Sequence, residues 1–362
     1  MAMSRAPFGN DPEKIERYRA FWNREEVKRP LVGFSFASWF PLGQFSACKA
    51  WSSSQYLTPD MIVPEAFLDD HVRMLREGET VDDDILRGAC PTQVAVLFLP
   101  GMVGCKVRLL PENCLGEERN LTWEEALQVR LDHQNPWFKK YIEFAQALVT
   151  ESRGRFPVSQ APDLGPTDLH AVLRGHSQSI IDLCDEPEKS AELLRNMGEV
   201  FRDFTEELWK CVPLFHGGYF DAQFSLWSPG PIIRMQEDAS AVYSPQLFRK
   251  LVQPVDRLLA SRFASAFIHL HSTSMFLLEA FLEIEEIQCY EINNDVCGPP
   301  IGEMVPYFQR VQKAKRPLLI RGSFEPEEIR LLMDSLEPRG LFLLIMVKTM
   351  EEVDTLRPLV KM

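Results

Sequence analysis

Long apolar runs are missing from this 362-residue sequence. The longest lie at residues 94–100 and 341–347, well short of the roughly 18–20 residues that a membrane-spanning helix needs. The first ten residues also lack the apolar segment of a secretory signal. We therefore expect a cytoplasmic protein that makes no contact with a membrane.

Basic residues are fewer than acidic ones: the sequence has 39 lysines and arginines and 52 aspartates and glutamates, so its formal net charge is −13. A protein that reads nucleic acid needs a positive face, so this balance argues against such a partner. The eight cysteines form no Cys-x-x-Cys pair, which predicts reduced thiols rather than a disulfide framework.

Glycine-rich turns and flexible linkers are absent too. The first apolar run, at residues 30–36, is followed by Ala-Ser-Trp-Phe and not by the glycine-rich turn of a dinucleotide-binding open sheet. No stretch rich in proline, glycine or serine divides the chain. We therefore predict a single domain over residues 1–362, in which residues 1–29 form an N-terminal helical extension.

What the sequence does contain is an alternation of short apolar runs with longer amphipathic stretches. The runs predicted as strands lie at residues 30–36, 94–100, 156–160, 219–224, 266–271, 287–292, 317–321 and 340–345. Strands that alternate with helices pair in parallel through right-handed crossovers, and eight is the number in a closed barrel. The predicted fold is α/β, a (β/α)8 TIM barrel, with an open doubly wound sheet as the main alternative.

In such a barrel the functional residues lie at the C-terminal ends of the strands and in the loops that follow. The polar and aromatic candidates there are Trp39, Gln160, Asp163, Asp221, Gln223, Phe224, Trp227, His269, His271, Glu291, Asn293, Asp295 and Arg321. Residues two apart point the same way along a strand, so neighbouring candidates on one strand face the barrel mouth together.

The segment His269-Leu270-His271 is the most informative of these. It predicts either a pair of metal ligands or an acid–base histidine at the barrel mouth. The alternative is two buried imidazoles that only bond to neighbouring carboxylates. We predict His271, His269, Asp221 and Glu291 as catalytic, with the two carboxylates orienting His271.

The remaining candidates are predicted to contact the substrate. Arg321 is suited to hold a carboxylate in a bidentate pair, or else to neutralise Asp221 or Glu291. The other predicted substrate contacts are Trp39, Gln160, Asp163, Gln223, Phe224, Trp227 and Asn293. Ordinary core packing is the alternative for the tryptophans. The acidic triplet at residues 82–84 is interpreted as a solvated turn.

Several short motifs resemble the uroporphyrinogen decarboxylase superfamily, in matching order and spacing, over roughly residues 155–360. They are Gly165-Pro166, Arg174-Gly175, Asp185-Glu186-Pro187-Glu188, Ser244-Pro245 with Phe248 and Pro254, Ile268-His269-Leu270-His271-Ser272, and Arg321-Gly322 with Glu325-Pro326. The family fold is a (β/α)8 barrel, in agreement with the strand count. The resemblance implies one of two chemistries, decarboxylation of a tetrapyrrole or methyl transfer that involves a corrinoid.

The decarboxylases of this superfamily carry an Arg-Gln-Ala-Gly-Arg-Tyr segment after the first strand, whose arginines bind the substrate's carboxylates. The corresponding residues 34–41 of this chain contain no arginine. A substrate with many carboxylates requires concentrated positive charge. The sequence therefore argues against decarboxylation of that tetrapyrrole.

The methyltransferases bind zinc through a His-x-Cys on the fifth strand and a distant cysteine near the C-terminus. In this chain His271 matches the histidine, but Thr273 stands at the cysteine position, and residues 346–348 hold no thiol. Because the expected cysteine ligands are absent, zinc binding requires a rearranged site of His269, His271 and Glu291. The sequence leaves the metal content open.

The expectation from the sequence is a methyltransferase-type barrel enzyme that acts with a corrinoid, a corrinoid protein or a small-molecule methyl donor. One alternative is a decarboxylase of a tetrapyrrole or a smaller carboxylic acid, in which Arg321 holds the remaining carboxylate. The other is a non-catalytic protein that binds a tetrapyrrole or a small acid. We expect a small-molecule substrate, and a homodimer is left open as the assembly.

Overall fold

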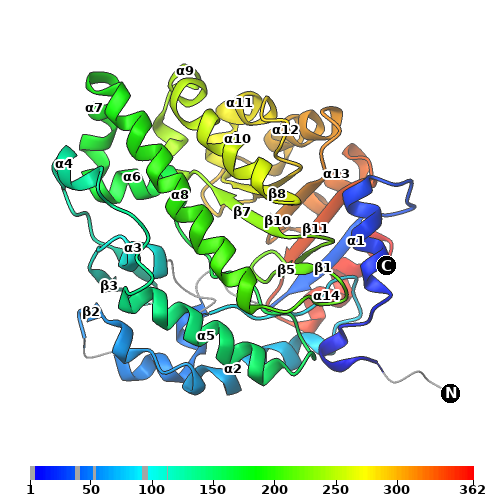
Figure 1. The fold of residues 1–362 in the computed structure, drawn as a ribbon. Helices are drawn as coiled ribbons and strands as arrows, with labels where there is room; N and C mark the ends of the chain where they lie inside the picture. Colours follow the sequence, from blue (N-terminus) through cyan, green and yellow to red (C-terminus); the bar gives the residue numbers. More distant parts are fainter. Residues whose placement is uncertain (1–4, 37–40, 52–53, 92–96, 112) are drawn as a thin grey trace.

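A six-stranded parallel sheet lies at the centre of the computed structural model, which describes residues 5–36, 41–51, 54–91, 97–111 and 113–362 (Figure 1). The strand order is β1-β11-β10-β9-β8-β7. These strands are β1 (Leu31–Ser35), β7 (Ile232–Gln236), β8 (Ser265–Leu270), β9 (Cys289–Asn293), β10 (Leu318–Gly322) and β11 (Leu341–Met346). The first and last of them in the chain are paired, as expected of a sheet that curls into a ring.

Two extended segments continue the ring beyond β1. Residues 84–90 lie beside β1, where the amide of Asp84 donates to the carbonyl of Val32 (3.0 Å). Residues 157–159 lie beside that segment through a parallel bridge at Ala89. The ring is therefore longer than the regular sheet, and these two segments occupy the places of its second and third strands.

The return from residues 157–159 to β7 depends on a close backbone contact. A Cβ atom on Gly165 would stand 1.4 Å from the carbonyl oxygen of Gln236, so only glycine fits here. The guanidinium of Arg234 also donates to the carbonyl of Asp163 (3.3 Å). These contacts bring the chain back to the edge of the sheet, and the fold is an α/β barrel of the TIM type.

Side chains of the sheet strands alternate between two separate apolar clusters, as the period of two in a strand requires. One set packs outward against the helices, and its members include Val32, Ile233, Ile268, Tyr290, Ile320 and Leu343. The other set points into the ring, and its members include Leu31, Ile232, Phe267, Cys289, Leu319 and Phe342. Because both faces of each strand are buried, the strands appear in the sequence as nearly continuous apolar runs.

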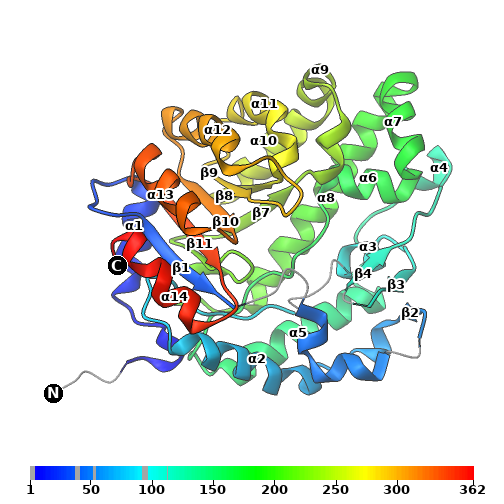
Figure 2. The ribbon, with the colours of Figure 1, turned by 180° about the vertical axis from the view of Figure 1, so that it is seen from behind.

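Helices cover the outer face of the sheet, as Figures 1 and 2 show. The α-helices of the described residues are α1 (Lys14–Asn23), α2 (Glu65–Glu79), α3 (Phe98–Met102), α4 (Trp123–Ala126), α5 (Pro136–Ser152), α6 (Pro166–Arg174), α7 (His176–Asp185), α8 (Pro187–Cys211), α9 (Pro245–Leu247), α10 (Gln253–Arg262), α11 (Leu278–Leu282), α12 (Ile301–Lys313), α13 (Pro326–Ser335) and α14 (Met350–Leu356), and all but α1 lie outside the ring. None of those in the described ranges has the length and apolar content needed to cross a membrane. A small antiparallel sheet is formed by β2 (Tyr56–Leu57), β3 (Val107–Leu109) and β4 (Cys114–Gly116).

A hairpin and the N-terminal helix fill one end of the ring. The hairpin consists of β5 (Tyr219–Asp221) and β6 (Leu226–Ser228), which pair antiparallel. From α1, the hydroxyl of Tyr18 donates to the carbonyl of Ser225 (2.6 Å), and the indole of Trp22 donates to the carbonyl of Trp227 (2.8 Å). The inward-facing apolar residues of the sheet pack against this hairpin.

The prediction of a strand at residues 94–100 was wrong for its described part. Residues 92–96 lie outside the described ranges, and Phe98–Met102 forms the short helix α3. Phe98 packs on Trp137 and Tyr141 of α5, with ring centroids 6.4 and 5.1 Å apart. A short apolar run is equally suited to a buried helix, and here tertiary packing decides.

The prediction of a barrel strand at residues 219–224 was also wrong. This segment enters the hairpin that fills the ring, and the partner of β8 is β7, which the sequence-based interpretation passed over. Both segments have strand composition, but Arg234 and Gln236 interrupt the apolar run of β7. Asp221, Gln223 and Phe224 therefore lie on a hairpin inside the barrel and not at the end of a barrel strand.

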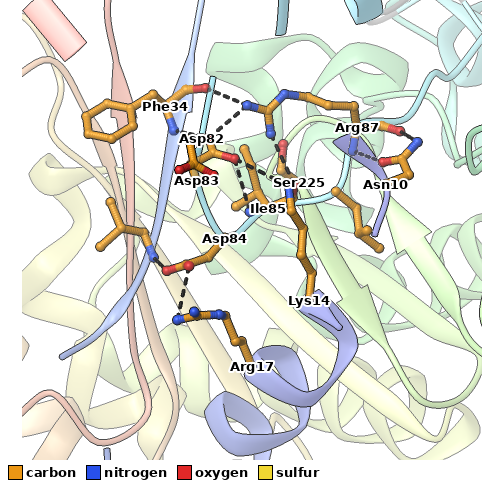
Figure 3. A network of polar contacts seen from close by, with 12 residues as sticks. Asn10, Lys14, Arg17, Phe34, Asp82, Asp83, Asp84, Ile85, Arg87 and Ser225 are labelled. Atoms are coloured by element: carbon orange, nitrogen blue, oxygen red, sulfur yellow. Dashed lines mark hydrogen bonds and ion pairs between the residues drawn. The ribbon is translucent and has the colours of Figure 1, made fainter. Parts of the chain in front are cut away.

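The acidic triplet is not a solvated turn. Asp82 is exposed, but Asp83 and Asp84 are buried, and their carboxylates accept hydrogen bonds from the backbone amides of β1 (Figure 3). Asp84 accepts from Val32 N (3.0 Å), and Asp83 accepts from Phe34 N (2.9 Å). Two side chains thus take the place of backbone partners between β1 and residues 84–90.

Candidate functional site

The two predicted histidines lie on and directly after β8, in the middle of the polar part of the ring. Parallel pairing places His269 opposite Gln236 of β7 on one side and opposite Glu291 of β9 on the other. The sheet therefore delivers side chains from three neighbouring strands to one place. His271 follows the last residue of β8 and begins the loop above it.

His269 and Glu291 form a fully buried pair. The Nδ1 atom of His269 and the Oε2 atom of Glu291 are in hydrogen-bond contact, and both side chains are almost completely shielded from solvent. Burial lowers the pKa of His269 well below its usual value and raises the pKa of Glu291 well above its own. Burial thus disfavours the charged form of both groups.

His271 is held between two carboxylates at the mouth of the barrel. Its Nδ1 atom lies 2.8 Å from Asp295 Oδ1, and its Nε2 atom lies 3.5 Å from Asp238 Oδ2. Burial opposes the charged form of the ring, but the hydrogen bonds to Asp238 and Asp295 outweigh it and raise the pKa of His271 to about 10. About a third of the side chain is exposed (36%), so a ligand can reach it.

Asp238, His269 and His271 form a group that is suited to a metal ion. Each offers one ligand atom, and these atoms lie within 4.8 Å of one another. Glu291 and Asp295 hold the Nδ1 atoms of the two rings, which leaves the Nε2 atoms for a ligand. The expected rearranged metal site differs in one member, because Glu291 stands behind His269 and Asp238 faces the two rings instead.

An aromatic ring and two buried arginines lie beneath the histidines. The ring of Phe224 is 5.3 Å from the ring of His269, and the guanidinium carbons of Arg234 and Arg321 each lie 5.5 Å from its centroid. Arg321 is 5% exposed; burial lowers its pKa to about 10, while the charges of Glu291 and other nearby carboxylates oppose this shift. Phe224 thus forms an apolar floor with two cations close to its ring.

Asp221 lies near these arginines but does not contact His271. Its Oδ1 atom accepts a hydrogen bond from Phe224 N (2.9 Å), so the carboxylate braces the hairpin. Burial raises its pKa to about 6, and the charge of Arg234 opposes this shift. The role predicted for Asp221, that of orienting His271, is filled in the structure by Asp295 and Asp238.

Asp163 and Asn293 are also buried inside the barrel. Asp163 accepts hydrogen bonds from Leu99 N (2.9 Å) and Leu164 N (3.0 Å), which fixes the loop after residues 157–159. Burial raises the pKa of Asp163 to about 7. Asn293 lies opposite Arg321 in the sheet, and its Oδ1 atom has no hydrogen-bond partner among the described residues.

Three predicted substrate contacts lie away from the histidines or outside the described residues. Gln160 faces α8, where Thr205 Oγ1 is 3.4 Å from its Oε1 atom. Trp227 packs against α1, and its indole donates a hydrogen bond to the carbonyl of Phe215 (2.9 Å). It is therefore a core residue, as the alternative interpretation held. Trp39 lies outside the described residues.

The sequence-based interpretation missed the contribution of β7 to the site. Arg234 and Gln236 point into the ring, and Asp238 follows the strand. Gln236 Nε2 donates to Asp238 Oδ2 (2.7 Å) and so orients that carboxylate toward His271. The available signal was the spacing Arg-x-Gln-x-Asp, since residues two apart share one face of a strand.

Comparisons with known proteins establish the fold of this chain but not its activity. No family model matches this chain, and no curated protein matches it either. Among solved structures, a methyltransferase from Methanosarcina mazei is similar, with a TM-score of 0.64 and 11% sequence identity over 95% of this chain and 97% of that chain. At this identity the likeness concerns the barrel fold alone.

Proposed function

We propose that this chain is a methyltransferase-type member of the uroporphyrinogen decarboxylase superfamily, with a divalent metal centre at Asp238, His269 and His271. One observation carries the proposal. Both imidazoles have their Nδ1 atoms on carboxylates, while Asp238 lies within ligand distance of the pair. The motif resemblance and the likeness of the fold to an archaeal methyltransferase support the reaction class.

The residues present fit a catalytic metal ion. Two imidazole nitrogens and one carboxylate oxygen leave coordination positions open, as in zinc sites that act on a substrate. The carboxylates of Glu291 and Asp295 behind the rings match the outer partners that fix metal-bound histidines. Without a thiolate the set also suits other divalent ions that accept nitrogen and oxygen ligands. When bound, such an ion supplies Lewis acidity, which lowers the pKa of a coordinated thiol or water.

The protein's own residues position the rings and the substrate. Asp295 and Glu291 hold the Nδ1 atoms of His271 and His269, so the Nε2 atoms are the ones turned toward a ligand. Arg234 and Arg321 beside Phe224 favour a substrate that carries an anionic group. A corrinoid, free or on a partner protein, is the methyl donor that the motif resemblance suggests.

Metal analysis of the untagged protein tests the metal centre. We expect about one equivalent of a divalent metal in the wild type and a severalfold loss in Asp238→Asn and His271→Gln. His133→Gln is the matched control, because that side chain is exposed (55%) and lies outside the site. Wild-type protein that stays metal-free after reconstitution with zinc, iron or manganese would overturn the metal centre.

A cobalamin titration tests the reaction class. A methyltransferase of this kind shifts the visible spectrum of added methylcobalamin and demethylates it in the presence of a thiol acceptor. The metal-site variants are expected to lose turnover more than affinity, because they remove groups that act on the transition state. No spectral shift and no methyl turnover with metal-loaded protein would refute the assignment.

A decarboxylase of a small carboxylic acid is the second candidate, favoured by the two buried arginines. In that reaction Arg321 holds a carboxylate that is retained in the product. Arg321→Met is expected to lower kcat/KM on acid substrates by about 100-fold, since a charged hydrogen bond in a buried site contributes roughly 1.5–3 kcal/mol. Unchanged turnover of every carboxylate substrate in this variant would exclude the candidate.

A further inference from the structure

Asp238 lies just beyond the last strand of the six-stranded sheet. That strand, β7, pairs with β8, and the register of the two strands ends at Gln236 and His269. Asp238 follows two residues later and begins a short 3-10 helix, Asp238–Val242. Because the hydrogen-bonded ladder ends before this segment, contacts from outside the sheet have to fix its position.

The first turn of α6 contacts the residues on both sides of Asp238. On the N-terminal side, the amide of Thr167 donates to Glu237 Oε2 (2.8 Å). On the C-terminal side, the amide of Ala239 donates to Asp168 Oδ1 (2.7 Å). Thr167, Glu237 and Asp168 are all buried, and hydrogen bonds are stronger in the protein interior than in water. The segment is therefore held to α6 at both flanks of Asp238.

Asp168 joins the helix to this segment because its two carboxylate oxygens have different partners. Oδ2 accepts from the amide of Gly165 (3.0 Å), the residue before the helix, which is a helix-capping contact. Oδ1 accepts from the amide of Ala239. The side chain of Asp238 is held separately, by Gln236 Nε2 (2.7 Å). Backbone and side chain of Asp238 thus have separate supports, one from α6 and one from β7.

The group of Asp238, His269 and His271 depends on this support for one of its three members. The two histidines lie on and directly after β8, and each ring has a carboxylate of its own at Nδ1. Asp238 Oδ2 lies 3.5 Å from His271 Nε2. A functional group of this kind has to be held within about 0.5 Å of its working position, so a shift of the backbone beside Asp238 would disrupt the group.

We propose that Asp168 is a positioning residue for the metal centre, and that it holds Asp238 opposite the two histidines through the amide of Ala239. Asp168 is not a member of the ligand group, so it acts on how well the centre binds a metal ion. This effect on metal binding rests on the proposed function, whereas the placement of Asp238 is a property of the chain itself. Groups that fix a metal ligand from behind typically change metal affinity by about 10–100-fold.

Competition for zinc with a chromophoric chelator tests the effect on metal binding. Asp168→Ala is expected to weaken zinc binding about tenfold, the lower end of that range, because Asp168 acts through the neighbouring residue. Asp168→Asn keeps one acceptor oxygen and should lose less. Glu328→Ala is the matched control, since Glu328 accepts from the amide of Glu325 (2.8 Å) before α13 as Asp168 does before α6. This control should bind zinc as the wild type does.

Two results of the zinc titration would overturn the proposal. One is equal zinc affinity in the wild type and Asp168→Ala. The other is an equal loss in Asp168→Ala and Glu328→Ala, because the loss of a helix cap would then be the cause. Circular dichroism shows whether each variant is folded. If Asp168→Ala does not fold, Asp168→Asn decides, and wild-type zinc affinity in that variant would overturn the proposal.

Metal-free crystal structures of the wild type and the Asp168 variants test the placement of Asp238 directly. We expect the distance from Asp238 Oδ2 to His271 Nε2 to increase by about 1 Å in Asp168→Ala, beyond what a working site tolerates. Wild-type protein that takes up no zinc would count against the proposed metal centre, and this distance then decides the role of Asp168. An unchanged distance in the folded variants would overturn it.

Discussion

Replacement of Asp84 tests whether buried carboxylates hold the barrel together beside β1. The side chain is 3% exposed and accepts from Val32 N (3.0 Å) and from Arg29 Nη2 (2.9 Å), with Arg17 Nη1 at 3.1 Å. Asp84→Ala removes all of these contacts and leaves a buried amide without a partner. The same triplet provides the control, because Asp82 is 72% exposed although it contacts Arg5.

The expected loss of stability in Asp84→Ala is about 3 kcal/mol. Breaking a buried ion pair costs roughly 3–5 kcal/mol, and an orphaned buried amide costs roughly 1–3 kcal/mol. The sum is reduced because the Arg29 and Arg17 side chains are 18% and 52% exposed and regain water. Asp84→Asn should lose less, since its amide oxygen still accepts from Val32.

Urea unfolding followed by circular dichroism measures these changes. Asp82→Ala is expected to stay within about 0.5 kcal/mol of the wild type, as surface substitutions do. The reasoning is refuted if Asp84→Ala loses no more stability than Asp82→Ala. Equal and large losses in both would place the stabilisation in the net charge of the triplet rather than in the buried contacts.

Further substitutions test the site floor, the ring closure and a buried histidine, each by urea unfolding. Phe224→Ala should cost about 3–5 kcal/mol, as truncation of a fully buried phenylalanine does; a loss below 1 kcal/mol would contradict its place in the barrel. Gly165→Ala should cost about 3 kcal/mol because the new Cβ overlaps the Gln236 carbonyl; wild-type stability would show that this backbone contact is looser. Burial lowers the pKa of His170 to about 4, so below pH 6.5 the unfolded chain binds a proton that the folded chain does not. Wild-type stability therefore falls as the pH drops toward 4, and His170→Leu should remove up to about 1.4 kcal/mol per pH unit of that slope; an unchanged slope would show that other groups cause it.

The sequence predicts best the strands whose two faces are both apolar. The expected strands at residues 266–271, 287–292, 317–321 and 340–345 correspond to β8, β9, β10 and β11 within a few residues. Parallel barrel strands are buried on both sides, so an apolar run marks them directly. The approximate strand count was therefore enough to identify the barrel, which the structure confirms.

The strands that carry buried polar side chains are the ones that cannot be recognised from an apolar pattern in the sequence. In β7 the inward positions include Arg234 and Gln236, and residues 84–90 include the buried charges beside β1, so neither segment forms an apolar run. Asp238 was missed because its strand was missed. His269, Glu291 and Asp295 were identified because β8 and β9 keep enough apolar residues on their outer faces.

Two sets of polar groups lie on different parts of the ring. Strands β7 to β9 carry the group around Asp238, whereas β1 and residues 84–90 carry Asp83 and Asp84 in place of backbone bonds. No hydrogen bond among the described residues joins the partners of Asp84 to those of Asp238. Effects at independent sites add, so the stability loss of Asp84→Asn with Asp238→Asn should equal the sum of the single losses. Metal content should follow Asp238 alone, and a coupling above about 0.5 kcal/mol would show that the wall beside β1 and the proposed metal centre act as one unit.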